Sequence, residues 1–399
     1  MEKTRHLFHQ CEPDVWCVLV ADSLSLPPQL VREEALRDVL RELAGVARLA
    51  HGALRAALDA DPSAASVRAG LGPLVADYAA RLGGAGELGV SAAADIQAEL
   101  LSPLLGGSSR LLTLPLERAA FLAVQAAAAE LETAYEGRVV LHTALLHDRA
   151  VAWSALAPHD TAALHALALR CLLPPPGSSS GRGGAAGPRT GSDGRGRGAE
   201  AGASSGGSPL DPARWRLGKG GVMEYLDGSE GGSSSGGLPT VYLCGGREPH
   251  LLLALRRGPL LLLLLLAPDG FNGGGSAGAR GLLQTRIAHL TDLAAPHLAA
   301  LGPLLAGQPS PMQHVRGLRY LFLDRLSLAV RASPPAKAST LSREALAALH
   351  QLRAQLDDSA GAAAAAAGTS RAPPDASEAR PPCCAQSTIC SLIPLSLFS

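Results

Sequence analysis

The chain has 399 residues, and its 35 Lys and Arg side chains balance its 35 Asp and Glu side chains, so its formal net charge is zero. This balance leaves no basic field to hold a polyanion, which argues against a general nucleic-acid binder. Hydrophobic residues make up 47% of the chain but aromatic residues only 3%, so its core must be mostly aliphatic, and its length suggests two or three folded units. Seven cysteines without a CxxC pair, and a first segment without an apolar signal-peptide core, indicate a reducing, cytosolic compartment.

Apolar runs and helical spacing predict the first elements. Val15–Ala21 has the length and content of a buried strand, and its Trp16 is expected to be a packing residue. From Leu30 to Leu58 apolar residues recur at three- and four-residue steps, which predicts one long amphipathic helix. Further helices are expected at Val67–Leu82 and at Leu116–Tyr135.

The middle of the chain changes to strand-like patterning. Val139–Leu146 and Ala150–Leu156 flank a short polar turn and predict a hairpin, after which a helix is expected from Pro158 through Cys171. His142 on the first strand is expected to be a structural histidine, and Trp153 on the second a packing residue.

Gly, Pro and Ser dominate the next stretch. Between Pro174 and Pro209 too few apolar side chains are present to offset the entropy cost of ordering the chain. Residues 174–237 are therefore assigned to a disordered insertion, within which structure resumes near Trp215. Four arginines of this stretch are interpreted as solvated linker charges rather than as an RNA-binding segment: Arg182, Arg189, Arg195 and Arg197.

A leucine-rich segment follows the insertion. Thr240–Cys244 predicts a strand, and Leu251–Leu255 with Leu260–Leu266 predicts a hairpin of two buried strands. A membrane span is not expected, because the uninterrupted apolar run would be about 12 Å long as a helix, whereas a bilayer core needs about 30 Å.

The last third combines helices with one more hairpin. A helical region is expected from Leu282 to Leu305, broken into two or three pieces at Pro296 and Pro303. Residues 358–399 are assigned to a disordered tail. The remaining predicted elements are a hairpin of Leu318–Leu323 with Leu326–Val330 and a helix over Ser342–Leu356.

Several motifs match the consensus sequence of a functional site but lack the secondary structure that such a site needs around it. Gly273-x-Gly275-x-x-Gly278 has the glycines of a dinucleotide-binding turn, but the acidic residue needed about 20 positions on would lie inside a helix. Gly232-x-Ser234-x-Gly236 matches the consensus of a nucleophile elbow, but no predicted strand precedes it. We therefore assign no catalytic, cofactor-binding or metal-binding residue and expect no covalent chemistry. Acylation remains an open alternative for Cys383, Cys384 and Cys390.

The order of the elements predicts an α/β fold of the α+β kind. A hairpin followed by an amphipathic helix occurs at Val139–Cys171 and again at Leu318–Leu356. With the strands that follow, the first copy amounts to an antiparallel five-stranded sheet covered by helices, which is the order of a longin-type module. Tandem modules of this kind offer sheet edges and helix faces for protein–protein contact.

Three segments carry a resemblance to a known family. Residues 12–20, Glu-Pro-Asp-Val-Trp-Cys-Val-Leu-Val, resemble a strand motif of the calcium-caffeine-zinc-sensitivity family of vacuolar fusion proteins. Residues 145–156, which include Trp153, and residues 320–329, which begin at Tyr320, resemble two hairpins of the same family. No single motif is specific to the family, but the order and spacing of the three motifs agree with those of the family from residue 12 to residue 357.

The resemblance implies three longin domains. Residues 1–135 would form a partial first domain, 136–308 a second domain with the insertion, and 309–357 a partial third. The sequence would begin at the last strand of the first domain, so that the two opening strands and first helix of that domain, and the remaining strands of the third, have no counterpart. A truncated or mis-spliced gene model is the expected explanation.

The resemblance also implies a function and its partners. The family pairs with the monensin-sensitivity family protein as a guanine-nucleotide exchange factor for a late-endosomal, Rab-seven type GTPase in vesicle-mediated transport, vacuolar fusion and autophagy. Exchange would be conformational, because the paired subunits displace a switch region and loosen nucleotide and Mg²⁺. The expected location is cytoplasmic, with peripheral contact to the late-endosomal or vacuolar membrane. The alternative is a longin-type trafficking adaptor or tether without exchange activity.

Overall fold

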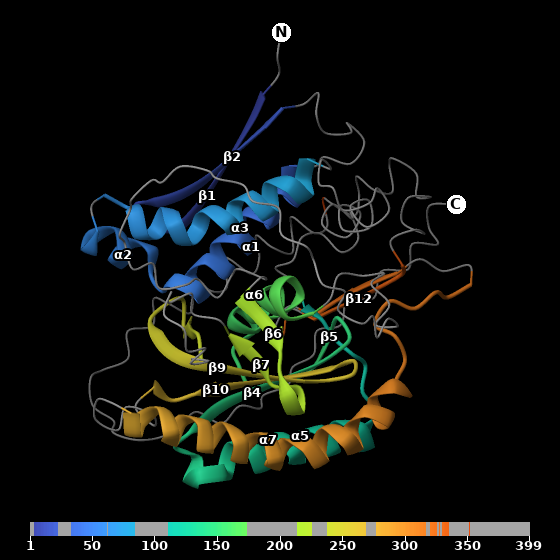
Figure 1. Ribbon diagram of the computed structural model, residues 1–399. Helices are drawn as coiled ribbons and strands as arrows, with labels where there is room; N and C mark the ends of the chain where they lie inside the picture. Colours follow the sequence, from blue (N-terminus) through green and yellow to red (C-terminus); the bar gives the residue numbers. More distant parts are fainter. Residues whose placement is uncertain are drawn as a thin grey trace, which may run out of the picture.

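The computed structural model describes residues 4–22, 33–61, 63–83, 111–173, 214–225, 238–268, 277–316, 320–324, 327, 329–334 and 351. These residues form helices and mainly antiparallel sheets, which confirms the predicted α/β class (Figure 1). The predicted helix Ser342–Leu356, apart from Gln351, and the predicted tail 358–399 lie outside the described residues.

An antiparallel five-stranded sheet lies at the centre of the molecule, in the strand order β5-β4-β10-β9-β8. The predicted hairpins and the strand between them are confirmed, and they supply the whole sheet. Its strands are β4 (Val140–His147), β5 (Ala150–Ser154), β8 (Thr240–Leu243), β9 (Glu248–Arg257) and β10 (Leu260–Leu266).

Strand β10 is the middle strand, and all seven of its leucines are buried. Side chains of a strand alternate between the two faces of the sheet. Leu261, Leu263 and Leu265 accordingly belong to one hydrophobic cluster, and the other leucines of the strand to a second cluster on the opposite face. The uninterrupted leucine run is therefore the pattern of a strand covered on both faces.

Helices α5 (Arg118–Thr133) and α7 (Ala277–Ala306) cover one face of this sheet (Figure 1). The expected breaks at Pro296 and Pro303 are wrong, because α7 is one helix of 30 residues. Both prolines are exposed, and so are Asp292 and Ala299, whose carbonyl groups lose their usual helical donor. Water can hydrate those carbonyls, while buried side chains on the opposite side hold the helix to the sheet: Leu290, Ala294, Leu298, Leu301 and Leu305.

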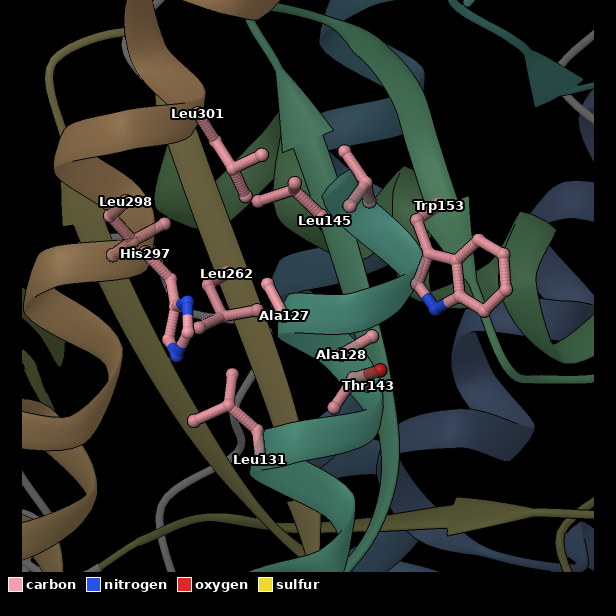
Figure 2. A pocket seen from close by; sticks show the side chains of 11 residues that line it. Ala127, Ala128, Leu131, Thr143, Leu145, Trp153, Leu262, His297, Leu298 and Leu301 are labelled. Atoms are coloured by element: carbon pink, nitrogen blue, oxygen red, sulfur yellow. The ribbon is translucent and has the colours of Figure 1, made fainter. Parts of the chain in front are cut away.

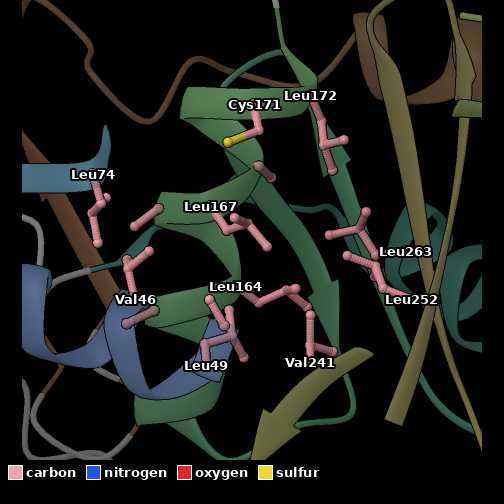
Figure 3. Packing of buried hydrophobic residues seen from close by; sticks show 14 of the residues in the cluster. Val46, Leu49, Leu74, Leu164, Leu167, Cys171, Leu172, Val241, Leu252 and Leu263 are labelled. Atoms are coloured by element: carbon pink, nitrogen blue, oxygen red, sulfur yellow. The ribbon is translucent and has the colours of Figure 1, made fainter. Parts of the chain in front are cut away.

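Helix α6 (Pro158–Leu167), extended by a π-helical turn over Ala168–Leu172, covers the other face together with α1 (Glu33–His51). Figure 3 shows Leu164 and Leu167 of α6 between Val46 and Leu49 of α1 on one side and Leu263 of the sheet on the other. One core thus joins residues of the predicted first and second domains. The boundary between residues 135 and 136 stays a prediction.

The prediction of one continuous helix from Leu30 to Leu58 is wrong. Helix α1 ends at His51, and a short helix α2 (Leu54–Ala60) follows before α3 (Ala65–Gly83), which confirms the predicted Val67–Leu82 helix. The break lies at Gly52, whose φ of +77° suits glycine and where a Cβ would lie 3.3 Å from the Gly246 carbonyl oxygen. The Ala53 amide donates to that same oxygen at 3.0 Å.

The predicted disordered insertion 174–237 contains a folded hairpin. Strands β6 (Trp215–Leu217) and β7 (Met223–Tyr225) pair around a 3₁₀ turn (Lys219–Gly221), which corrects that boundary but agrees with structure resuming near Trp215. Trp215, Met223 and Tyr225 are buried in the core. Gly221 lets this hairpin approach β9, because a Cβ there would lie 2.4 Å from the Arg256 carbonyl oxygen. Residues 174–213 and 226–237 lie outside the described residues.

A small three-stranded sheet lies at the edge of the central sheet. The predicted last hairpin is confirmed in shorter form as β11 (Leu321–Leu323) and β12 (Ala329–Ala332). An additional strand, β3 (Leu111–Leu112), pairs with β12 in parallel, and the next residue, Thr113, bridges to Val151 of β5. A 3₁₀ turn (Ala134–Gly137) connects α5 to β4.

An antiparallel hairpin of β1 (Thr4–Glu12) and β2 (Val15–Asp22) lies over α1 at one end of the molecule, away from the five-stranded sheet (Figure 1). Strand β2 confirms the predicted strand Val15–Ala21. Strand β1 was not predicted, because Val15–Ala21 was expected to be the first strand of the chain. Polar residues such as His6, His9 and Gln10 interrupt its apolar pattern.

Candidate functional site

The amino-terminal hairpin has two chemically different faces. Leu7 and Cys11 of β1 are buried, and Val15, Cys17 and Leu19 of β2 pack against the same core. The alternate residues point the other way. We call this second face the outer face, and its apolar members are Phe8, Trp16, Val18 and Val20.

The outer face exposes large apolar side chains next to one another. Phe8 is 58% exposed and lies opposite Val18 in the strand pairing, while Trp16 is 57% exposed. Of the ten exposed large hydrophobic side chains among the described residues, four lie on this face. Adjacent exposed apolar side chains of this kind, rich in aromatic rings, are typical of protein-binding surfaces.

The turn of the hairpin is held in place by the amino-terminal end of α2. Both oxygens of the Glu12 carboxylate accept hydrogen bonds, one from the Leu54 amide at 2.9 Å and one from the Arg55 amide at 2.9 Å. These amides are among the donors that a helix leaves unpaired at its first turn. A two-stranded sheet is marginal alone, so this bond pair and the buried inner face fix the orientation of the outer face.

The histidine that lies on the inner face is kept neutral by its surroundings. Burial, followed by the positive charges of Arg41 and Arg48, lowers the pKa of His9 below its ordinary value of 6.5, so that the imidazole is uncharged at neutral pH. The hairpin therefore presents a largely apolar packing face to α1, and a ligand of the hairpin would contact its other face.

The expectation that Trp16 is a buried packing residue is wrong. The run Trp16–Val20 has the composition of a fully buried strand, but in the structure only Cys17 and Leu19 pack against the core, where they are partly buried. Strictly alternating polarity would have signalled a half-exposed strand, and here the exposed positions are apolar as well. Trp153 is half-buried on β5, with its ring edge-on to Phe121 at 5.6 Å between centroids.

A buried charged cluster was not foreseen from the sequence. The Arg170 guanidinium donates to the Glu42 carboxylate at 2.5 Å and lies 3.6 Å from the centre of the Tyr78 ring, and the Tyr78 hydroxyl donates to the same carboxylate. The Glu42 and Arg170 side chains are 4% and 6% exposed. The cluster joins α1, α3 and the turn after α6, so we interpret it as a packing device rather than a reactive site.

A cavity lies between α5, α7 and the sheet (Figure 2). Its volume of about 20 Å³ is room for one water molecule, and leucines, alanines and Val124 form most of its wall. Its polar groups are mostly engaged, because Thr143 donates to Glu132 at 2.7 Å and His297 pairs with Glu130 at 3.2 Å. A cavity of this size and lining does not accommodate a nucleotide or another cofactor.

Three further features bear on the sequence analysis. His142 is half-buried on β4, and its ring meets that of His250 at 5.9 Å between centroids. Within the part of the chain that the structure describes, no group of three His, Cys, Asp or Glu residues could hold a metal ion. The helices found among the described residues are all too short or too polar to cross a membrane.

The remaining candidate motifs cannot be placed. The glycine motif at 273–278 lies outside the described residues except for its end, which falls in the first turn of α7. The motif at 232–236, the four insertion arginines and the three terminal cysteines also lie outside the described residues.

Comparisons with known proteins identify relatives along most of the chain. No protein-family model matches it. It is 28% identical over 377 residues to the vacuolar fusion protein CCZ1 homolog B of Arabidopsis thaliana, covering 89% of this chain and 72% of the relative. Homolog A of the same plant is 27% identical, with coverage of 89% and 73%, and the rice (Oryza sativa subsp. japonica) homolog is 28% identical, with coverage of 89% and 70%.

Proposed function

Because this chain belongs to the CCZ1 family of vacuolar fusion proteins, we propose that it is one subunit of a heterodimeric guanine-nucleotide exchange factor. A role in vacuolar fusion follows from the family. The finer proposal is that the chain pairs with the monensin-sensitivity family protein, that the pair activates a Rab-seven type GTPase, and that it works at the late-endosomal or vacuolar membrane.

The observation that carries this proposal is the outer face of the amino-terminal hairpin. Phe8 and Trp16 are each more than half exposed, on a hairpin whose position is fixed by a buried inner face and by the Glu12 bonds to α2. A rigid aromatic surface is suited to burial against a second protein, where tryptophan and other aromatic anchors contribute much of the binding energy.

A binding function is consistent with the chemistry of the described residues. The buried ion pair of Glu42 with Arg170 joins two helical segments, and the cavity between α5, α7 and the sheet has room for one water molecule. Nucleotide exchange requires no bond to be made or broken by the protein. It requires that the factor bind the nucleotide-free GTPase more tightly than the nucleotide-bound form, so that association drives release.

Release of fluorescent GDP from a Rab-seven type GTPase tests this proposal. The full chain is co-expressed with its monensin-sensitivity family partner, and the purified pair is added to the loaded GTPase. We expect accelerated release with the pair and slow intrinsic release with either subunit alone. Copurification without any acceleration would contradict the proposal.

A binding assay separates exchange from the alternative of an adaptor or tether. An exchange factor holds the nucleotide-free GTPase most tightly, whereas a tether prefers the GTP-bound form. The pair is therefore passed over immobilised GTPase in the nucleotide-free, GDP-bound and GTP-bound states. We expect greatest retention on the nucleotide-free form, and preference for the GTP-bound form would favour the adaptor.

A further inference from the structure

Two cysteines on the inner face of the amino-terminal hairpin bring their sulfur atoms together. The Cys11 and Cys17 Sγ atoms lie 2.8 Å apart, and both residues are free thiols. They come from different strands, β1 and β2, and are six residues apart in the sequence. The other two described cysteines, Cys171 and Cys244, are not part of this pair.

A β-bulge produces this contact. The strand pairing is regular from Thr4 with Asp22 to Gln10 with Trp16, and it then shifts so that Glu12 lies opposite Val15. Cys11 is the extra residue of the bulge. Because a bulge re-aims the side chain of its extra residue, the Cys11 thiol turns toward Cys17, although the direct partner of Cys17 in the strand pairing is His9.

The surroundings of the pair favour a thiolate on Cys11. A hydrogen bond from the Cys17 thiol, with a smaller contribution from the positive charge of Arg48, lowers the pKa of Cys11 to about 7. The same interaction and burial raise the pKa of Cys17, which keeps its proton. Cys11 is 8% exposed and Cys17 is half-buried, so that the pair borders solvent and a small oxidant can reach it.

We propose that Cys11 and Cys17 form an oxidative modification site that closes to a reversible disulfide when it meets a hydroperoxide. The Cys11 sulfur attacks one peroxide oxygen, the O–O bond breaks, and a sulfenic acid forms as the leaving hydroxide takes up a proton to give water, or a leaving alkoxide takes one up to give an alcohol. Cys17 then loses its proton, its sulfur attacks the Cys11 sulfur, and the S–O bond breaks to release water. Two thiols are oxidised and one peroxide is reduced.

This inference is independent of the proposed exchange activity. It rests on the S–S contact and the bulge, and its readout is the oxidation state of the hairpin. The disulfide would lie on the inner face, so that it would lock β1 to β2 while leaving Phe8 and Trp16 exposed on the other side.

Hydrogen peroxide is the probe for the experiment. The reduced full chain is exposed to about one equivalent of peroxide, blocked with iodoacetamide and digested with trypsin. Both cysteines fall in one tryptic segment, His6 to Arg32. We expect this peptide to lose the mass of two hydrogen atoms and to resist alkylation, and we expect dithiothreitol to restore alkylation.

Two comparisons guard against a non-specific reaction. Exposed Cys244 has a pKa raised by partial desolvation of its thiol and by the neighbouring Glu248. Exposure alone would favour oxidation of Cys244, whereas thiolate content favours oxidation of Cys11. We expect Cys11 to be oxidised at least about tenfold faster than Cys244 at neutral pH.

The variant Cys17→Ser removes the resolving thiol but keeps a hydroxyl that can donate to Cys11, and Cys244→Ser serves as its matched control. We expect Cys17→Ser to accumulate a sulfenic acid that dimedone traps on Cys11, without the two-hydrogen loss, and Cys244→Ser to behave like the unmodified chain. Retention of both alkylatable thiols in the unmodified chain, while Cys244 becomes oxidised, would overturn the proposal. This reading does not depend on how well the variants fold.

Discussion

Strands β10 and β2 have similarly apolar sequences and opposite environments. Leu260–Leu266 in β10 is buried on both faces between the helix pairs α5–α7 and α1–α6, and each face receives every second leucine. Trp16–Val20 in β2 packs against the core on one face only, through the partly buried Cys17 and Leu19, and its other face exposes Trp16, Val18 and Val20.

The residue types of the two strands match this difference. The central strand consists of leucines, which fill a core without polar atoms or exposed edges. The outer face contains a tryptophan and β-branched valines, together with Phe8 from the neighbouring strand, and these types are suited to a stiff surface that another protein can cover. A continuous apolar strand therefore belongs either to a core or to a binding face. Which of the two it is depends on whether other elements cover both faces of the strand.

The largest loss of stability is expected where the core contains charge. Arg170→Ala would leave the Glu42 carboxylate buried without its ion-pair partner, which costs about 3–5 kcal/mol of unfolding free energy. Chemical denaturation of the full chain measures the loss. Arg55→Ala, which breaks an exposed pair with Asp59, is the matched control and should cost less than about 1 kcal/mol. Equal losses would contradict the assignment of the cluster as a buried packing device.

A pair of truncations tests the two strands against each other. Leu263→Ala removes a fully buried side chain from β10 and is expected to cost about 2–5 kcal/mol of unfolding free energy. Val18→Ala removes a half-exposed side chain from the outer face and should change stability by no more than about 0.5 kcal/mol. If thermal unfolding showed a large loss for Val18→Ala, the outer face would have to be covered by another part of the chain.

Acid should weaken the core through its histidines. Burial is the largest cause that lowers the pKa of four of them below 6.5 in the folded protein, so the unfolded chain takes up protons first as the pH falls. Their contribution to stability is complete above about pH 6.5 and is lost below it, by at most about 1.4 kcal/mol per pH unit for each group. Thermal unfolding between pH 7.5 and 5.5 measures the effect, on the order of a few degrees. The four are His9, His51, His165 and His250.

One histidine allows a direct control of that acid effect. His165 is buried, and its Nε2 lies 2.8 Å from the Arg149 carbonyl oxygen, to which it donates as Nε2–H. His165→Gln keeps a donor without a proton that titrates in this range, so it should flatten the pH dependence. An unchanged slope would show that His165 makes no contribution to the acid sensitivity.

Much of the fold could be predicted because the central sheet depends on local pattern. The hairpin turns around Asp148 and Gly258 separate clear apolar runs, and each run became a strand. The errors came from tertiary contacts. The kink at Gly52 depends on the approach of Gly246, and α7 stays continuous through Pro296 because leucines on its opposite side are held by the sheet.

The candidate site was less accessible to sequence reasoning. Apolar content alone placed Trp16 in a core, since exposure depends on which elements cover each face of a strand. The Cys11–Cys17 contact depends on a bulge, and the Glu42–Arg170 pair joins residues 128 positions apart. Neither leaves a periodic signal in the sequence.

The affinity of the full chain for the proposed monensin-sensitivity family partner tests the central claim most directly, with Trp16→Asp compared against Leu217→Asp by calorimetry. Both substitutions place a carboxylate at a side chain that is more than half exposed, but Leu217 lies on β6, outside the outer face. We expect Trp16→Asp to weaken binding at least about thirtyfold, corresponding to a loss of about 2 kcal/mol, with an unfolding temperature like that of Leu217→Asp. Equal affinities for the two variants and the unmodified chain would contradict the assignment of the outer face as the binding surface.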